Sequence, residues 1–410
     1  MNFGISAETV YAGGKVDLSA IASLPDIVIL DAANSSDPMI MADYSRQLLT
    51  HSLSSILPIV MIGKASDFAK FDVNLHLDCR APAHVIAKKL KHAIRIAAMK
   101  LEHMARLETA RVFGIAAEAA AEPAPAKSER LLVVGKGERY FQLASAFQGT
   151  ASLKCVTTFA EAWRILEEKA AFDCLIIDTF ASPDFDLDDL KARKLNTRFF
   201  SLPVLLLQEG LSFETQEALA ETGICDLFDL QGGGSEIAAY VKTLIQAERM
   251  RLSLLTAFKA PRFEPVHDRT TGLASRAFFE KHLERLLVQS RAWRIPVAFG
   301  LLDVSVLFHA GGESDHARCR VIHAQVGQTI ASLVRAEDTA THLGDGKFVI
   351  AAPNSTGLTI SVLIGRISAV LGMTAFSVGD ELGRIDIDTH YFESRPGDSL
   401  QTVMQELTGG

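Results

Sequence analysis

The stretch Leu333–Phe348, which reads LVRAEDTATHLGDGKF, decides how the last third of the chain folds. An amphipathic run ends in Arg335-Ala-Glu-Asp338, and five residues later Gly344-Asp-Gly-Lys-Phe348 opens the apolar segment Val349–Ala352. An amphipathic period followed by a short apolar run predicts a helix, a polar turn and then a β-hairpin. The polar turn carries an arginine and a carboxylate three residues apart.

The segments before this stretch complete a domain. A helical pattern over Glu236–Phe258 and an extended link lead to His267–Phe279, where Thr271-Gly272 predicts a turn before a helix. Pro296–Asp303 is an apolar run that ends in a carboxylate, which predicts a buried strand with Asp303 at its end.

Composition excludes several classes of function. The 410 residues, a length typical of two to four domains, carry a net charge of −8 with both signs interspersed, so the concentrated basic face that duplex DNA requires is missing. The five cysteines are scattered and form no CxxC pair, which argues against a disulfide framework or a zinc site. No signal peptide pattern and no uncharged apolar stretch of about 18 residues occurs. We therefore expect a cytoplasmic protein with no nucleic acid partner and no direct membrane insertion.

An internal repeat precedes this domain. The run DIVILD at Asp26–Asp31 matches DCLIID at Asp173–Asp178, and LPIVMI at Leu57–Ile62 matches LPVLLL at Leu202–Leu207. Strands alternate with helical patterns in both halves, which predicts doubly wound parallel sheets. Between the halves, Ile115–Glu129 is rich in Ala, Glu and Pro and predicts a linker.

The two repeats resemble the receiver domains of bacterial response regulators, which have the flavodoxin-like (βα)5 fold of two-component signalling and phosphorelay proteins. The resemblance implies that Asp31 and Asp178 occupy the phosphoacceptor position. Phosphorylation of an aspartate needs Mg²⁺ and therefore further carboxylates. The second repeat has Gly135-Lys-Gly137 in place of the acidic pair, so we expect Asp178 to stay unmodified. Asp31 remains a candidate in a first repeat whose first β-α unit looks missing.

The last domain resembles GGDEF domains, the diguanylate cyclase family, with a ferredoxin-like palm fold. The family holds GTP with two Mg²⁺ bound to carboxylates, and Asp303 stands where it has one metal ligand. Its signature Gly-Gly-Asp-Glu-Phe is replaced here by Gly344-Asp-Gly-Lys-Phe348. Gly346 supplies no ligand and Lys347 repels a metal. We therefore expect a degenerate domain with no catalytic residues, no catalytic metal and no enzyme activity.

The same family carries an R-x-x-D site for cyclic di-GMP five residues before its signature, and Arg335 and Asp338 stand in that register. The resemblance adds Arg366 as a supplementary ligand. An arginine fork pairs with guanine O6 and N7 or with phosphate, and a carboxylate accepts from guanine N1–H and its amino group. The alternatives are a surface ion pair for the first two residues and a solvated charge for Arg366. A second R-x-x-D string, Arg395-Pro-Gly-Asp398, predicts an exposed turn.

The combination of two degenerate receivers and a degenerate GGDEF domain resembles the PopA-like cyclic di-GMP effectors of alphaproteobacteria. The resemblance implies a homodimeric adaptor at the cell pole that binds cyclic di-GMP. It further implies that protein partners, a cell-cycle regulator and accessory factors, are brought to the ClpXP protease for regulated proteolysis. Two alternatives stay open: a residual diguanylate cyclase, and a response regulator scaffold driven by phosphorylation of Asp31.

The sequence thus predicts an α/β multidomain protein with two flavodoxin-like receiver domains followed by a ferredoxin-like GGDEF domain. The predicted bounds are 1–112 for the first receiver-like domain, 113–129 for a linker, 130–250 for the second receiver, 251–266 for a linker and 267–410 for the GGDEF domain.

Overall fold

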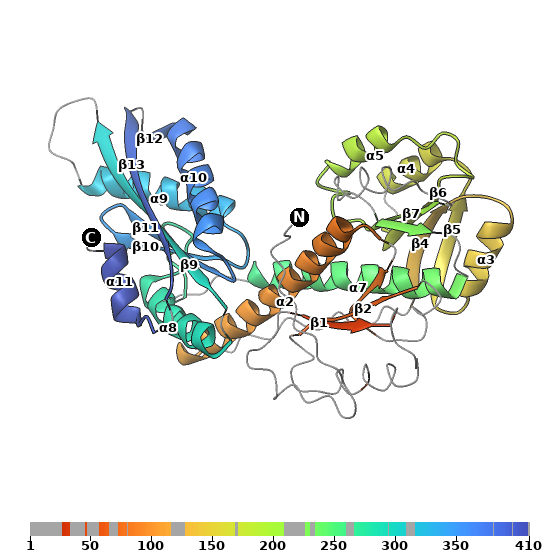
Figure 1. Cartoon of the computed structure of the whole chain (residues 1–410). Coiled ribbons are helices and arrows are strands. Elements are labelled where there is room, and N and C mark those ends of the chain that lie inside the picture. The colour runs from red at the N-terminus through yellow and green to blue at the C-terminus, as the bar shows by residue number, and fades with distance from the viewer. Residues whose placement is uncertain are drawn as a thin grey trace. The chain divides into compact units, whose positions relative to one another are not determined.

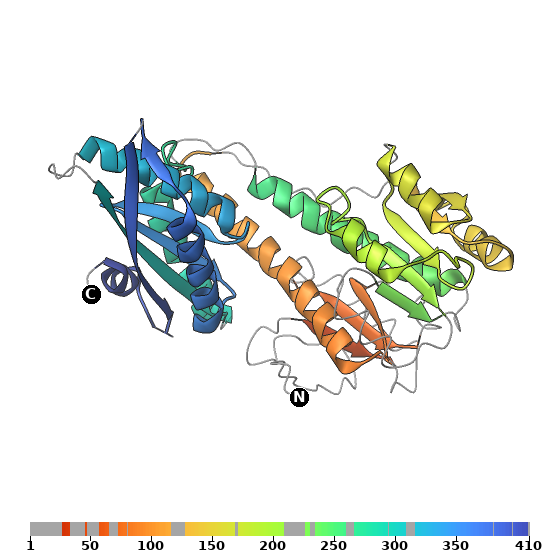
Figure 2. The ribbon, with the colours of Figure 1, turned by 90° about the horizontal axis from the view of Figure 1, so that it is seen from above.

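The computed structural model describes residues 27–32, 46, 57–64, 73–79, 81–115, 128–168, 171–208, 226–229, 234–259, 266–293, 295–308, 316–379, 381–395 and 397–408. The chain divides into two compact units. The first comprises Met1–Ile21, Pro25–Ala97 and Glu122–Ser253, and the second comprises Ala22–Leu24, Ala98–Ala121 and Leu254–Gly410. Figures 1 and 2 show the helices and strands of both units.

The first unit begins with a small parallel sheet. Among the described residues its strands are β1 (Val28–Asp31), β2 (Ile59–Gly63) and β3 (Leu75–Asp78), in that order. Val60 and Met61 are fully buried, because a parallel sheet that is covered on both faces needs apolar side chains on both sides. Asp31 ends β1 and is exposed.

A second parallel sheet in the first unit has five strands in the order β5-β4-β6-β7-β8. Numbered along the chain, this is the order 2-1-3-4-5 of flavodoxin-like doubly wound sheets. Phe159 and Trp163 are buried against one face, and Ile237 and Val241 are buried against the other. The strands are β4 (Glu129–Val134), β5 (Ala151–Val156), β6 (Cys174–Asp178), β7 (Val204–Gln208) and β8 (Asp226–Asp229), and the helices are α3 (Glu138–Ala146), α4 (Phe159–Glu167), α5 (Leu187–Lys194) and α7 (Gly234–Phe258).

The second unit is built on an antiparallel sheet of order β10-β11-β9-β13-β12. Helices α9 and α10 cover one face through residues such as Ile330 and Ile364, and α8 and α11 cover the other through Phe279 and Val403. The strands are β9 (Val297–Phe308), β10 (Thr339–Gly344), β11 (Lys347–Pro353), β12 (Phe376–Val378) and β13 (Glu381–Glu393), and the helices are α8 (Arg276–Trp293), α9 (His316–Leu333), α10 (Gly357–Met373) and α11 (Leu400–Thr408).

Two long helices have residues in both units. Helix α2 (Ala83–Val112) starts in the first unit and has its residues from Ala98 onward in the second. Helix α7 changes units after Ser253 and continues to Phe258, so the beginning of the predicted linker 251–266 is helical. Most of the predicted linker 113–129, residues 116–127, lies outside the described residues. The predicted domain bounds stay predictions.

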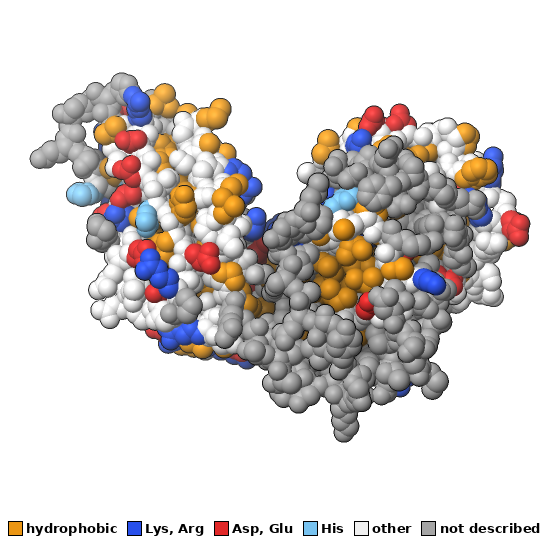
Figure 3. Space-filling view, viewed as in Figure 1, with side chains coloured by type: hydrophobic (Ala, Val, Ile, Leu, Met, Phe, Trp, Pro, Cys, Tyr) orange, Lys and Arg blue, Asp and Glu red, His pale blue; other side chains and the backbone are white. Residues whose placement is uncertain are grey.

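The outer face of α10 is unusually apolar for an exposed surface. Leu358 and Val362 are 78% and 67% exposed, and with Arg366 they follow each other at intervals of four residues, so all three lie along one side of the helix. Hydrophobic side chains are visible on this part of the surface in Figure 3. Within the described ranges no helix is long and apolar enough to span a membrane.

We predict opposite effects for two helical glycines. A Cβ at Gly327 of α9 would lie 2.5 Å from Cβ of Thr271, which is buried at the turn before α8. Gly327→Ala should therefore overpack this contact and lower the free energy of unfolding by about 1–3 kcal/mol. A Cβ at Gly365 of α10 would meet nothing within 4 Å. Gly365→Ala should therefore raise the free energy of unfolding by roughly 0.5–1 kcal/mol. Thermal unfolding of both variants measures this, and a stabilised Gly327→Ala protein would contradict the packing.

Candidate active site and ligand site

The turn between α9 and β10 brings Arg335 and Asp338 together through the backbone. The N–H of Asp338 donates to the carbonyl of Arg335 at 3.1 Å, and the N–H of Arg335 donates to Oδ2 of Asp338 at 3.2 Å. The Asp338 carboxylate therefore closes a local turn of the kind that aspartate favours. Arg335 is exposed, whereas Asp338 is only 5% exposed.

Asp338 is held in an environment that penalises its charge. Burial, followed by the neighbouring Glu337 carboxylate, raises the pKa of Asp338 to about 7. Its Oδ1 atom is buried and has no hydrogen-bond partner among the described residues. A buried carboxylate oxygen without a donor is costly, so a hydrogen-bond donor that reached this atom would stabilise its charged form.

Arg366 reaches the same turn from α10. Its guanidinium donates to the carbonyl of Leu333 at 2.9 Å, two residues before Arg335. Both arginines are exposed. The three residues that the sequence singled out therefore come from one turn and from α10, and they gather at one place.

The second R-x-x-D string forms the same turn. The N–H of Arg395 donates to Oδ2 of Asp398 at 2.7 Å, and the N–H of Asp398 donates to the carbonyl of Arg395 at 3.0 Å. Asp398 is only half-buried, in contrast to Asp338. The string thus encodes a turn at both places, and only the surroundings distinguish them.

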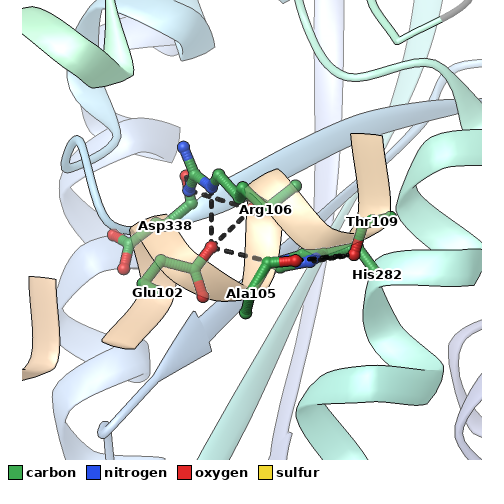
Figure 4. A network of polar contacts seen from close by, with 7 residues as sticks. Glu102, Ala105, Arg106, Thr109, His282 and Asp338 are labelled. Atoms are coloured by element: carbon green, nitrogen blue, oxygen red, sulfur yellow. Dashed lines mark hydrogen bonds and ion pairs between the residues drawn. The ribbon is translucent and has the colours of Figure 1, made fainter. Parts of the chain in front are cut away.

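Helix α2 contacts the first of these turns from within the second unit. Arg106 donates to the backbone carbonyl of Asp338 at 2.9 Å and to Oγ1 of Thr339 at 3.0 Å. Its Nε donates to the buried carboxylate of Glu102 at 2.6 Å. In Figure 4 the side chain of Asp338 points away from Arg106, while its backbone faces the guanidinium.

The hairpin between β10 and β11 contains Gly344–Phe348, the segment that resembles a degenerate GGDEF signature. Gly344, Asp345 and Gly346 all have positive φ angles, of 108°, 47° and 78°. A Cβ at Gly346 would lie 2.2 Å from the carbonyl oxygen of Val304 on β9. Since that neighbour is backbone, this position has no room for a side chain unless the strands shift.

Asp303 and Lys347 face each other across β9 and β11. They are register partners in the sheet, and Nζ of Lys347 lies 2.5 Å from Oδ2 of Asp303. The ammonium occupies one oxygen of the carboxylate that the sequence predicted at the end of this strand. Among the described residues, no group of three or more His, Cys, Asp or Glu side chains is arranged to hold a metal ion.

The acidic residue of the second parallel sheet is also paired with a base. Asp178 is buried at the end of β6, and its Oδ1 accepts from Arg139 of α3 at 3.1 Å and from the N–H groups of Phe180 and Ala181. The corresponding Asp31 ends β1, and the structure does not describe the segment that follows Ala32. Phosphorylation at either position stays a prediction.

Sequence reasoning missed the residues that surround these sites. It placed Arg106 within the first predicted domain, 1–112, and it did not single out Glu102, His282 or Arg139. The i,i+4 spacing of Glu102 and Arg106 was the one visible signal. Contacts between residues 180 positions apart, such as Glu102 and His282, leave no local pattern.

Residues 265–407 match the family model described as GGDEF: Diguanylate cyclase, GGDEF domain. This part of the chain is a GGDEF domain, as the motifs predicted. Over 227 residues the chain is 25% identical to the response regulator PleD of Caulobacter vibrioides (strain NA1000 / CB15N). The matched residues make up 55% of this chain and 50% of that protein. The chain spans about half the length of the curated relatives that it matches.

Two solved structures match part of this chain. The GGDEF domain of DgcB from Caulobacter crescentus, solved in complex with c-di-GMP, is 20% identical, with a TM-score of 0.32 over 36% of this chain and 88% of that one. The diguanylate cyclase SiaD from Pseudomonas aeruginosa, solved with its activator SiaC, is 19% identical, with a TM-score of 0.33 over 38% of this chain and 60% of that one.

We predict that Asp338 makes the stability of the fold depend on pH. Its pKa is raised from 3.8 to about 7, so its favourable contribution is complete below the unfolded pKa and is lost as the pH rises through about 7. Between pH 4.5 and pH 8, wild type should therefore lose roughly 2–4 kcal/mol relative to Asp338→Asn, whose side chain stays neutral. Urea unfolding at both pH values measures this difference. Asp398→Asn, at the more exposed turn, is the control, and parallel pH profiles for wild type and Asp338→Asn would contradict the prediction.

Proposed function

We propose that the chain is a catalytically inactive GGDEF protein that binds cyclic di-GMP at the turn of Arg335 and Asp338 and acts as a signalling effector. One observation carries the proposal: a buried carboxylate oxygen of Asp338 without a partner lies at a turn that two exposed arginines, Arg335 and Arg366, also reach. The carboxylate can accept hydrogen bonds from a guanine nucleotide, and the two guanidinium groups can donate hydrogen bonds to it.

The chemistry of guanine fits these groups. The Watson–Crick edge of guanine donates through N1–H and the amino group, and the carboxylate of Asp338 is an acceptor. The opposite edge accepts at O6 and N7, where an arginine fork binds with two parallel hydrogen bonds. Arg335 and Arg366 are positioned by the backbone of the same turn, so one can address the base and the other a phosphate. Cyclic di-GMP presents both kinds of group.

The donor set at the former active site does not fit Mg²⁺. Magnesium requires several oxygen ligands in octahedral geometry, but Asp303 is paired with Lys347, whose ammonium competes with a cation for the same carboxylate. At Gly346 the backbone of Val304 leaves no space for the missing carboxylate. These contacts support loss of catalysis, because a cyclase of this family would need metal ligands at both positions.

The parallel sheets of the first unit support a scaffolding role. The guanidinium of Arg139 pairs with Oδ1 of Asp178 from within the chain, and burial separates this acid from phosphoryl donors in solution. A response regulator scaffold driven by phosphorylation would have to act through Asp31, which is exposed. Acetyl phosphate labelling that is lost in Asp31→Asn would favour that alternative.

The partner hypothesis extends the ligand hypothesis. A homodimeric effector without catalytic output has to act through other proteins, and the PopA-like architecture implies an adaptor that recruits a cell-cycle regulator and accessory factors for proteolysis by ClpXP at the cell pole. The apolar strip of Leu358 and Val362 continues into Arg366, so a partner bound there would lie beside the ligand. Exposed apolar residues at such a position suit a protein contact.

We predict that wild type binds cyclic di-GMP with micromolar or tighter affinity and that Arg335→Ala weakens binding by about 10–100-fold. Loss of the fork removes a charge-assisted contact, whereas Arg395→Ala removes the equivalent residue of the exposed turn and should bind like wild type. Isothermal titration of the three proteins measures this. Equal affinities for wild type and Arg335→Ala would overturn the site.

We further predict that the protein makes no cyclic dinucleotide from GTP and Mg²⁺. Lys347→Glu should be inactive as well, since it restores a single carboxylate while Gly346 still offers none. Chromatography of the reaction mixture against an active diguanylate cyclase measures product. Catalytic turnover by wild type would establish a residual cyclase instead.

A further inference from the structure

We propose that Arg106 of helix α2 is a positioning residue for the dinucleotide site, and that ligand binding at this site is coupled to the C-terminal half of α2. The inference rests on the proposed function of the Arg335 and Asp338 turn. It concerns the residues of α2 from Ala98 onward, which belong to the same compact unit as the turn.

Arg106 holds the backbone of the turn where it enters β10. Its guanidinium donates to the carbonyl of Asp338 at 2.9 Å and to Oγ1 of Thr339 at 3.0 Å. It also lies over the ring of Phe258, with 4.6 Å between the guanidinium carbon and the ring centroid. These contacts fix the main chain of the residue whose carboxylate is proposed to read guanine.

The position of Arg106 is fixed in turn by a buried carboxylate. Nε of Arg106 donates to Glu102 at 2.6 Å, and Nε2 of His282 lies 2.9 Å from the same oxygen. Burial alone would raise the pKa of Glu102, but His282 and Arg106 together outweigh it and hold this pKa below its ordinary value. An ionised carboxylate therefore lies between two donors at 2% exposure.

Both ring nitrogens of His282 contact α2. Nδ1 lies 3.2 Å from the hydroxyl of Thr109, which donates to the carbonyl of Ala105 at 2.8 Å, and Nε2 lies 2.9 Å from Oε1 of Glu102. The network shown in Figure 4 therefore places a histidine, a carboxylate and a guanidinium in series, and it connects α2 to α8 and to the turn.

This arrangement links the ligand site to a helix outside the GGDEF domain. A bound guanine would donate hydrogen bonds to Oδ1 of Asp338. It would thereby reduce the motion of the turn to which Arg106 is hydrogen-bonded. Because such coupling is reciprocal, an interaction that stabilises the position of α2 must also raise the affinity for the ligand, and by the same factor by which the ligand strengthens that interaction. The same helix α2 begins at Ala83, and β3 of the first parallel sheet, which ends at Asp78, is the strand before it in the chain. Occupancy of the site is thereby transmitted to α2.

The first test compares affinities in the full-length chain. Arg106→Ala should weaken cyclic di-GMP binding about tenfold, the equivalent of ~1.4 kcal/mol, and Arg106→Lys should recover part of the loss because it restores a cationic donor. The matched control is Arg291→Ala, which removes the arginine that donates to the carbonyl of Asp398 at the second turn. Wild-type affinity in Arg106→Ala would overturn the inference.

The second test can be decided with the wild-type protein alone. Amide hydrogen exchange of wild type with and without cyclic di-GMP should show slower exchange at residues 102–112 of α2 when the ligand is bound, and the effect should disappear in Arg106→Ala. Unchanged exchange of these residues in a protein saturated with ligand would overturn the coupling while leaving the proposed function intact. Failure of wild type and all variants to bind cyclic di-GMP would overturn both.

Discussion

The constraint that shapes this protein is that a carboxylate removed from water needs a positive partner. At two buried positions the chain supplies that partner itself, Arg139 for Asp178 and Arg106 with His282 for Glu102, and Lys347 pairs with the half-buried Asp303. Each pair closes a place that metal or phosphate chemistry could otherwise use, or fastens one element to another. Asp338, Asp178 and Glu102 each have one buried oxygen without a hydrogen-bond partner among the described residues, but burial raises the pKa of Asp338, whereas His282 and Arg106 hold that of Glu102 below its ordinary value. In our account Asp338 is where the ligand supplies the donors.

The sequence alone predicted several of the described elements and the residues of the candidate site. Apolar runs predicted β2, β6 and β7 closely, because strands buried on both faces leave a continuous hydrophobic signal. Register with the degenerate signature singled out Arg335 and Asp338, the family resemblance added Arg366, and the structure brings the three residues to one turn. β9 was underestimated: it continues beyond Asp303 to Phe308, where exposed and buried residues alternate and the apolar run breaks.

The sequence could not predict contacts between residues that lie far apart in the chain. The proximity of Glu102 to His282 and of Arg106 to Asp338 depends on how α2 packs, and neither periodicity nor spacing encodes it. The two R-x-x-D turns make the same point, because their internal hydrogen bonds are alike. The difference lies in what surrounds each carboxylate, and burial by distant residues separates a candidate ligand site from an ordinary turn.

The most direct measurement of the central claim is a carbon NMR titration of the Asp338 carboxyl, assigned through Asp338→Asn, with and without cyclic di-GMP. Hydrogen bonds from guanine to the charged form would stabilise it. The account predicts that the pKa of Asp338 falls from about 7 in the free protein to well below that value when the ligand is bound. An unchanged titration curve in the presence of bound ligand would contradict it.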